Sequence, residues 1–239
     1  MGINKDKVVQ KYNSLDRIWS SEDKWHKRTY ATIQSFIEKY VVPLTQEDNF
    51  ILNAGSAGNP YGLPEKNMQH LDIANEKIAH LPNAKVGSIE NIPFPDETYN
   101  TIICVGSVLN YADPMKAIQE FNRVLLPGGF LVVEFENSNT LELVFKKDFN
   151  KKAVFVDTFY YGKEQLWYYS DTWINEIIGL NKFETIRRYK FHYLSAFMYR
   201  FTKNENKAGK FFELDPLFRF IPFIRNLASN TIILCQKKN

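Results

Sequence analysis

Ile51-Leu52-Asn53-Ala54-Gly55-Ser56-Ala57-Gly58-Asn59-Pro60 is an apolar run that breaks into small residues. It predicts a strand followed by a loop whose backbone N–H groups a ligand can approach, because no bulky side chain stands in the way. Asp72 follows a second segment that ends in an apolar residue and is predicted to be the next strand. A carboxylate at the end of a strand suits the hydroxyl groups of a ribose. Together these features indicate a nucleoside-bearing cofactor at the carboxyl edge of a parallel sheet. For the glycine loop taken alone, a plain strand and turn is the alternative.

Strand-like and helix-like segments alternate beyond this stretch. Tyr99–Val105 and Phe130–Phe135 are apolar, as strands covered on both faces should be. Pro114–Leu125 lies between them and has the pattern of an amphipathic helix. Alternation of this kind predicts right-handed βαβ units and a parallel sheet. Further segments predicted along the chain are a helix at Thr172–Leu180 and strands at Phe183–Phe191 and Thr231–Gln236.

Residues 4–42 carry apolar side chains at helical spacing and predict two helices that end at Pro43. We therefore expect residues 1–45 to form an N-terminal helical extension and residues 46–239 to form one α/β domain.

The bulk composition excludes several classes of protein. A net charge of +3 is too small to argue for nucleic-acid binding. Cys104 and Cys235 lie in strand-like runs and are predicted to be buried thiols of a reducing compartment. The first residues lack the apolar core of a signal peptide and no run is long enough to span a membrane, so we expect a cytoplasmic location. No metal site is expected, since the histidines have no ligand-like spacing: His26, His70, His80 and His192.

Three blocks carry a family resemblance: Ile89–Asn100 (IENIPFPDETYN), Val108–Pro114 (VLNYADP) and Glu120–Gly129 (EFNRVLLPGG). In the last block, an acid is followed by an arginine three residues later, an apolar pair and Pro-Gly-Gly ahead of a strand. With them, residues 50–136 resemble the class I S-adenosylmethionine (SAM)-dependent methyltransferases, in particular the small-molecule branch related to quinone biosynthesis.

The resemblance implies a Rossmann-like, seven-stranded, mostly parallel sheet with an antiparallel last strand between its neighbours and helices on both faces. It also implies SAM as cofactor. The loop at Gly55 would approach the methionine part of SAM, Asp72 the ribose, and Ile73 the adenine. The full set of implied cofactor-binding residues is Asn53, Gly55, Ser56, Ala57, Asp72, Ile73, Ser88, Ile89, Gly106, Ser107, Asn110 and Tyr111.

The chain departs from the family pattern at several positions. Asn53 and Ser88 stand where acids are usual, and Pro60 and Pro64 predict that the first crossover helix is short or absent. The cofactor site would then be more open, or covered by another part of the chain. Candidates for a lid are Trp19, Trp25, His26 and Tyr30.

Residues 192–230 are predicted to be a basic, aromatic insertion before the last strand. Between residues 187 and 225, nine basic residues stand against three acids, with many large apolar side chains among them. This composition favours a lipid-linked or other small-molecule acceptor and peripheral membrane contact through residues 192–225. The alternatives are single-stranded nucleic acid and a solvated insertion that covers the sheet. Other candidates for the acceptor pocket are Tyr160, Tyr161, Trp167 and His192.

The predicted reaction is direct, in-line transfer of a methyl group from SAM to this acceptor. Much of the rate of such a transfer can come from positioning and desolvation. If a general base is needed, His192, Tyr111 and Asp113 are the candidates, and the sequence does not choose among them. Two other functions compete with this one: a non-catalytic methyltransferase-like binding module and a nicotinamide-dependent oxidoreductase. The oligomeric state is not readable from the sequence.

Overall fold

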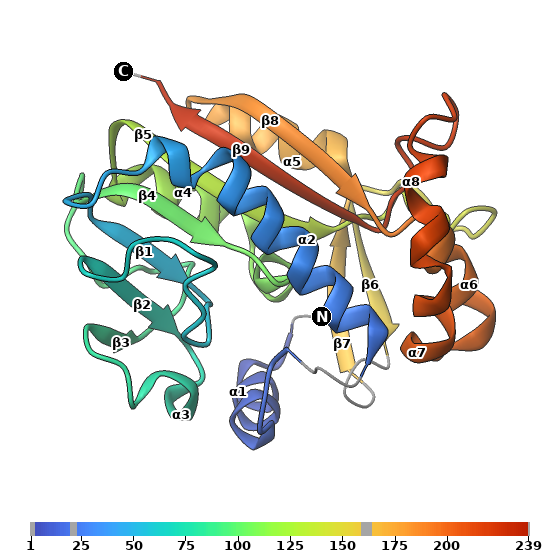
Figure 1. Cartoon of the computed structure of the whole chain (residues 1–239), viewed down its shortest axis with the longest axis horizontal. Coiled ribbons are helices and arrows are strands. Elements are labelled where there is room, and N and C mark those ends of the chain that lie inside the picture. Colours follow the sequence, from blue (N-terminus) through green and yellow to red (C-terminus); the bar gives the residue numbers. More distant parts are fainter. Residues whose placement is uncertain (1–2, 20–22, 159–163, 239) are drawn as a thin grey trace.

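A seven-stranded sheet with the strand order β3-β2-β1-β4-β5-β9-β8 forms the centre of the molecule (Figure 1). The computed structural model describes residues 3–19, 23–158 and 164–238. Neighbouring strands from β3 to β5 pair in parallel, whereas β9 pairs antiparallel with both β5 and β8. The predicted Rossmann-like sheet with an antiparallel last strand between its neighbours is thus confirmed. The strands are β1 (Ile51–Ala54), β2 (Met68–Asp72), β3 (Ala84–Val86), β4 (Tyr99–Cys104), β5 (Leu125–Glu136), β8 (Phe183–Phe191) and β9 (Asn230–Lys237).

Apolar layers cover both faces of the sheet. In β4, Ile102 and Ile103 point to opposite faces, and each belongs to a separate buried cluster. This explains why the strand reads as a continuous apolar run rather than an alternating one.

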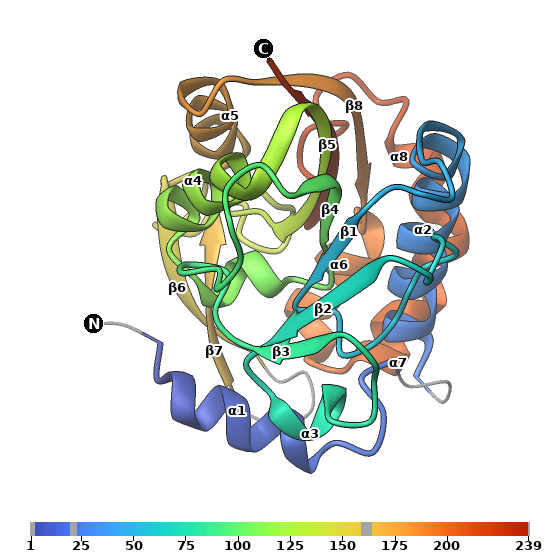
Figure 2. The ribbon, with the colours of Figure 1, turned by 90° about the vertical axis from the view of Figure 1, so that its left-hand side faces the viewer.

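One face is covered by α4 (Pro114–Val124) and α5 (Asp171–Leu180), and the other by α2 (Lys24–Tyr40) (Figure 2). Helix α2 begins after Asp23, whose side chain accepts a hydrogen bond from the backbone N–H of His26 at 2.8 Å. It buries Ile33 and Ile37 completely against the sheet. The second N-terminal helix is therefore part of the main core.

The connection between β1 and β2 contains no helix: residues 55–67, all of them described, form turns. This agrees with the expected loss of the first crossover helix. Beyond β2 lies the short helix α3 (Asn75–Ile78), and the first N-terminal helix, α1 (Lys5–Ser14), packs beside it (Figure 2). Helix α1 thus lies near the edge of the sheet at which the parallel strands end (Figure 1).

Two structures follow the parallel part of the chain. A separate two-stranded antiparallel sheet consists of β6 (Ala153–Thr158) and β7 (Glu164–Tyr169). The predicted insertion between β8 and β9 is helical and packs Tyr199 and Phe212 against Trp25 of α2. Its elements are α6 (Leu194–Thr202), α7 (Glu205–Ala208), the 3-10 helix η3 (Gly209–Leu214) and α8 (Asp215–Phe218), and the remaining 3-10 helices are η1 (Val42–Leu44) and η2 (Val108–Tyr111).

Element boundaries differ from the sequence expectations in two places. Helix α1 ends at Ser14, so Ile18 and Trp19, which fall in the range 4–42 predicted to form two helices, lie in the segment after it. Strand β5 begins at Leu125 and includes Pro127-Gly128-Gly129, with a register irregularity opposite Tyr99 and Thr101. None of the described helices is long and apolar enough to cross a bilayer.

Candidate active site

The loop after β1 approaches the loop after β4 very closely. Gly55 has a φ of +76°, and a Cβ atom there would lie 2.4 Å from Cγ1 of Val108. Glycine is therefore required at this position for both backbone and packing reasons. The close approach brings the tips of β1 and β4 to one side of a shared hollow.

Asp72 joins the loops after β1 and β2. Its Oδ2 atom accepts a hydrogen bond from the N–H of Ala57 at 3.0 Å, and its Oδ1 atom accepts one from the N–H of Ala74 at 2.8 Å. Burial raises the pKa of Asp72, while these two bonds act in the opposite direction. Each carboxylate oxygen can accept a further bond, because each has a second lone pair. The Asp72 side chain can therefore hold the two loops in place and still accept hydrogen bonds from the hydroxyl groups of a ligand.

A first hollow lies where these strands end. Nine of the predicted cofactor-binding residues line it, and eight of these lie at the strand ends or in the loops after them: Gly55, Ser56, Ala57, Asp72, Ile73, Ser88, Ile89 and Gly106. They come from the loops after β1, β2, β3 and β4, which are far apart in the sequence. Tyr111, at the end of η2, lines the hollow as well.

The N-terminal segment forms the outer wall of the first hollow, through Lys5, Val8, Tyr12, Ile18 and Trp19. Lys5 pairs with Glu90, and Lys77 of α3 donates to the carbonyl of Leu15. The indole N–H of Trp19 donates to the Tyr61 hydroxyl at 3.1 Å. Of the predicted lid residues, Trp19 thus lies at the first hollow, whereas Tyr30 packs behind it against Trp19.

A second hollow adjoins the first and shares Tyr12, Ile18, Trp19, Gly106 and Tyr111 with it. It also reaches the predicted residue Ser107 and two further predicted lid residues besides Trp19, namely Trp25 and His26. Its other lining residues are Thr29, Glu136, Leu166 and Asn230.

Two buried acids near the end of β5 were not predicted from the sequence. Glu134 accepts bonds from the N–H groups of Gly106 and Ser107 at 3.0 and 2.7 Å and from Asn230 Nδ2 at 2.8 Å. Glu136, two residues further along the same face, accepts a bond from the Ser107 hydroxyl at 3.0 Å and lines the second hollow. The sequence did contain a sign of them, because Glu134 and Glu136 stand at alternate positions of an otherwise apolar strand. Buried acids are rare without a partner or a function, so such a pattern indicates a site.

Two predicted cofactor-binding residues do not line either hollow. Asn53 is buried and donates to the carbonyl of Asn59, so it stabilises the loop from behind. Asn110 is completely buried and bonds to the backbone of Glu136 and Trp167. Both side-chain amides therefore stabilise the loops around the site and do not form part of its lining.

Among the three candidate bases, only Tyr111 lines the hollows. Asp113 is exposed and caps α4 by accepting from the N–H of Met115 at 2.9 Å. His192 is completely buried, stacks on Trp25 with ring centroids 4.1 Å apart, and has its Nε2 2.8 Å from Thr29 Oγ1. Neither His192 nor Asp113 therefore lies where it could act as the base, and the prediction of these two residues is corrected. The pocket candidates Tyr160 and Tyr161 lie outside the described residues, and Trp167 packs on Phe155.

A protein-family model described as a methyltransferase domain matches residues 64–133. A demethylmenaquinone methyltransferase from Staphylococcus epidermidis is 30% identical over 161 residues, which are 62% of this chain and 65% of that protein. The corresponding protein of Staphylococcus haemolyticus is 33% identical over 159 residues. The alignment therefore spans just under two thirds of the length of these relatives.

Solved structures share the fold at lower sequence identity. A geranyl diphosphate C-methyltransferase from Streptomyces coelicolor aligns with a TM-score of 0.60 at 10% identity, over 98% of this chain and 97% of that one. A SAM-dependent methyltransferase from Clostridium acetobutylicum aligns with a TM-score of 0.56 at 15% identity, over 98% and 99% of the two chains. The chain thus resembles methyltransferases in the domain that residues 64–133 match, in sequence over just under two thirds of its relatives, and in its fold.

Proposed function

We propose that the protein transfers a methyl group from SAM to a small, lipid-linked acceptor. The observation that carries this proposal is the first hollow, where the tips of four strands bring Asp72, the Gly55 loop and Gly106 together. The matched methyltransferase domain and the curated relatives support SAM as the methyl donor.

In this proposal Asp72 accepts hydrogen bonds from the ribose hydroxyls of SAM, and each charge-assisted bond contributes about 1.5–3 kcal/mol. The Gly55–Ala57 loop lies along the methionine part, Ile73 packs on the adenine, and Ser88 and Ile89 lie at the adenine edge. The methyl group then points toward Gly106 and the second hollow. The N-terminal segment of residues 3–19 acts as a lid on the catalytic domain and excludes water from the site.

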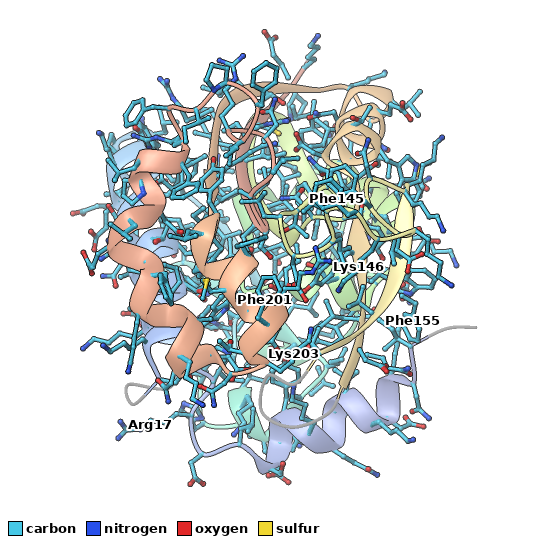
Figure 3. The ribbon with its side chains drawn as sticks, turned by 90° about the vertical axis from the view of Figure 1, so that its right-hand side faces the viewer. Arg17, Phe145, Lys146, Phe155, Phe201 and Lys203 are labelled. Carbon is cyan, nitrogen blue, oxygen red and sulfur yellow. The ribbon has the colours of Figure 1, made fainter. Side chains whose placement is uncertain are left out.

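For the acceptor, the relatives named demethylmenaquinone methyltransferases favour a ring attached to a prenyl chain. The basic, aromatic insertion offers a surface for membranes that hold such a compound. Phe201 and Phe223 are 64% and 89% exposed. Phe145, Lys146, Phe201 and Lys203 lie on one face of the molecule, shown in Figure 3. Apolar side chains beside basic ones suit an anionic bilayer surface.

The test of the reaction is a mass-spectrometric assay with SAM and a dihydroxynaphthalene that carries a short prenyl chain, kept reduced by dithionite. The proposal predicts one added methyl group per acceptor and the release of S-adenosylhomocysteine (SAH). Binding of SAH without transfer to any hydroxyl-bearing acceptor would favour the non-catalytic module. Binding of NAD in place of SAH would favour the oxidoreductase.

Membrane contact is tested separately by sedimentation with vesicles. The full chain should bind vesicles of anionic phospholipid more strongly than vesicles of phosphatidylcholine. The double variant Phe201→Ser/Phe223→Ser should lose most of this binding. Leu180→Ser is the matched control, because Leu180 is 74% exposed but lies at the end of α5, outside the insertion. Equal binding by all three proteins would contradict membrane contact through residues 192–225.

A further inference from the structure

Polar and aromatic residues together line the second hollow. Glu136 lies in its lining, and Tyr12, Trp19, Trp25 and Tyr111 supply rings from three separate parts of the chain. Because the second hollow shares Gly106 and Tyr111 with the first, a group held in it would face whatever the first hollow holds.

The two oxygens of Glu136 have different surroundings. Oε1 accepts a hydrogen bond from the Ser107 hydroxyl at 3.0 Å. Oε2 is buried and has no well-formed hydrogen bond within the described part of the chain. The Tyr168 hydroxyl nevertheless acts on the Glu136 carboxyl group and lowers its pKa. Such a buried, unsatisfied carboxylate oxygen is costly unless a ligand supplies the missing partner.

Burial raises the pKa of Glu136 to about 8. The acids Glu134, on β5, and Glu142 raise it further, whereas Ser107 and the Tyr168 hydroxyl of β7 act in the opposite direction. The other titratable side chains that line the second hollow are Tyr12 of α1, His26 of α2 and Tyr111 of η2. A carboxyl group poised near pH 8 can both accept and return a proton under ordinary conditions.

We propose that the second hollow binds a hydroxyl-bearing aromatic ring and that Glu136 is the residue that accepts the proton of that hydroxyl during methyl transfer. This inference rests on the proposed methyltransferase function and specifies its acceptor class and its base. Tyr111, a base candidate from the sequence, becomes part of the aromatic wall.

The acceptor in this step is a hydroquinone ring. The ring O–H bond breaks, its proton moves to Glu136 Oε2, and its electron pair enters the ring. A ring carbon forms a bond to the methyl group while the sulfur–methyl bond breaks, and its electrons stay on sulfur to give SAH. The substituted ring carbon then loses its hydrogen to water as a proton, and Glu136 returns its proton to the ring oxygen. The net products are methylated hydroquinone, SAH and one proton.

Ring binding is measured first, by calorimetric titration of the SAH-saturated full chain with the prenylated dihydroxynaphthalene. We expect saturable binding, and Trp25→Ala should weaken it. An absence of binding at millimolar concentrations, while SAH still binds, would overturn the assignment of the second hollow. A wild-type chain that fails to bind SAH would overturn the proposed function itself, and this inference with it.

The role of Glu136 is measured with Glu136→Gln, which keeps an oxygen for the Ser107 hydroxyl but cannot accept the proton. We expect kcat to fall at least 100-fold with the affinity for SAH unchanged, in the range of general acid–base catalysis. The wild-type kcat/KM should rise with pH around an apparent pKa near 8, and the variant should lose this rise. Glu136→Asp should recover part of the rate.

Glu142→Gln is the matched control, because Glu142 is also buried and also accepts from Tyr168, at 3.4 Å, but does not line the second hollow. It should keep kcat within a few-fold of the wild type. If Glu136→Gln keeps kcat and its pH profile while SAH binds, Glu136 is not the proton acceptor.

Discussion

The hydroxyl groups of Tyr12 and Tyr111 lie 3.1 Å apart, and their rings meet edge to face with centroids 5.9 Å apart. Tyr12 belongs to α1 and Tyr111 to η2, so this contact joins the N-terminal segment to the loop after β4. It lies at the boundary between the two hollows, because both residues line both of them. The N-terminal segment is thus held across the site where the proposed reaction takes place.

Loosening this segment should weaken cofactor binding. Lys5→Ala removes the ion pair with Glu90, and Tyr12→Phe removes the hydroxyl that meets Tyr111. Because a half-exposed ion pair and a hydrogen bond each contribute about 0.5–1 kcal/mol, the double variant should raise the dissociation constant for SAH roughly 5- to 30-fold. Lys7→Ala, on the exposed side of the same helix, is the control and should bind SAH like the wild type. Equal affinities in all three proteins would remove the lid from this account.

Gly55 should not tolerate a side chain. Gly55→Ala places a Cβ atom 2.4 Å from Val108 Cγ1 and holds alanine at a φ of +76°. Backbone strain and overpacking together should cost about 2–4 kcal/mol of unfolding free energy, measured by urea denaturation. Gly179→Ala is the control, because its Cβ would meet no atom within 4 Å, and alanine in a helix gains up to about 1 kcal/mol. A Gly55→Ala protein as stable as the wild type would mean that the two loops do not approach as described.

His192 should make stability depend on pH in a specific direction. Burial holds the pKa of His192 well below its usual 6.5, so the folded protein keeps this imidazole neutral. Below about pH 6.5 the unfolded chain binds a proton at this position that the folded one does not, and stability is lost as the pH falls. Between pH 7.5 and 5.5 the wild type should therefore lose about 1 kcal/mol more unfolding free energy than His192→Gln.

His80→Gln, at an exposed position, is the control for the removal of a histidine from the chain. Parallel curves for the wild type and His192→Gln would show that His192 binds its proton equally well in the folded and unfolded chains, which contradicts its burial as a neutral ring.

Much of the fold could be predicted because its signals are local and strong. The apolar run around Ile102 and the glycine loop at Gly55 indicated a buried parallel sheet, and β1 and β4 lie where they were expected. Glu120 and Arg123, the acid and the arginine of the third family block, form an ion pair at 2.8 Å. Arg123 in addition binds Asp96 and the carbonyl groups of the preceding loop, contacts between distant segments that no spacing rule predicts.

The site was harder to predict because side-chain direction decides it. Asp72 and Gly106 could be placed from strand ends alone, since parallel strands end at one edge of a sheet. His192 looked like a candidate base from its residue type, but Trp25 and Phe212 enclose its ring. Glu136 was not predicted because an acid within a strand indicates a site only if its side chain is buried, and the sequence alone does not show that burial.

The central claim is that Asp72 and the neighbouring loops bind the adenosyl part of SAM. Calorimetric titration of the full chain with SAH tests it most directly, alongside Asp72→Ala and the exposed-acid control Asp48→Ala. The account predicts one bound SAH per chain, an affinity at least tenfold lower for Asp72→Ala, equivalent to about 1.4 kcal/mol, and no change for Asp48→Ala. No heat of binding in the wild type, or the same dissociation constant for Asp72→Ala and the wild type, would contradict it.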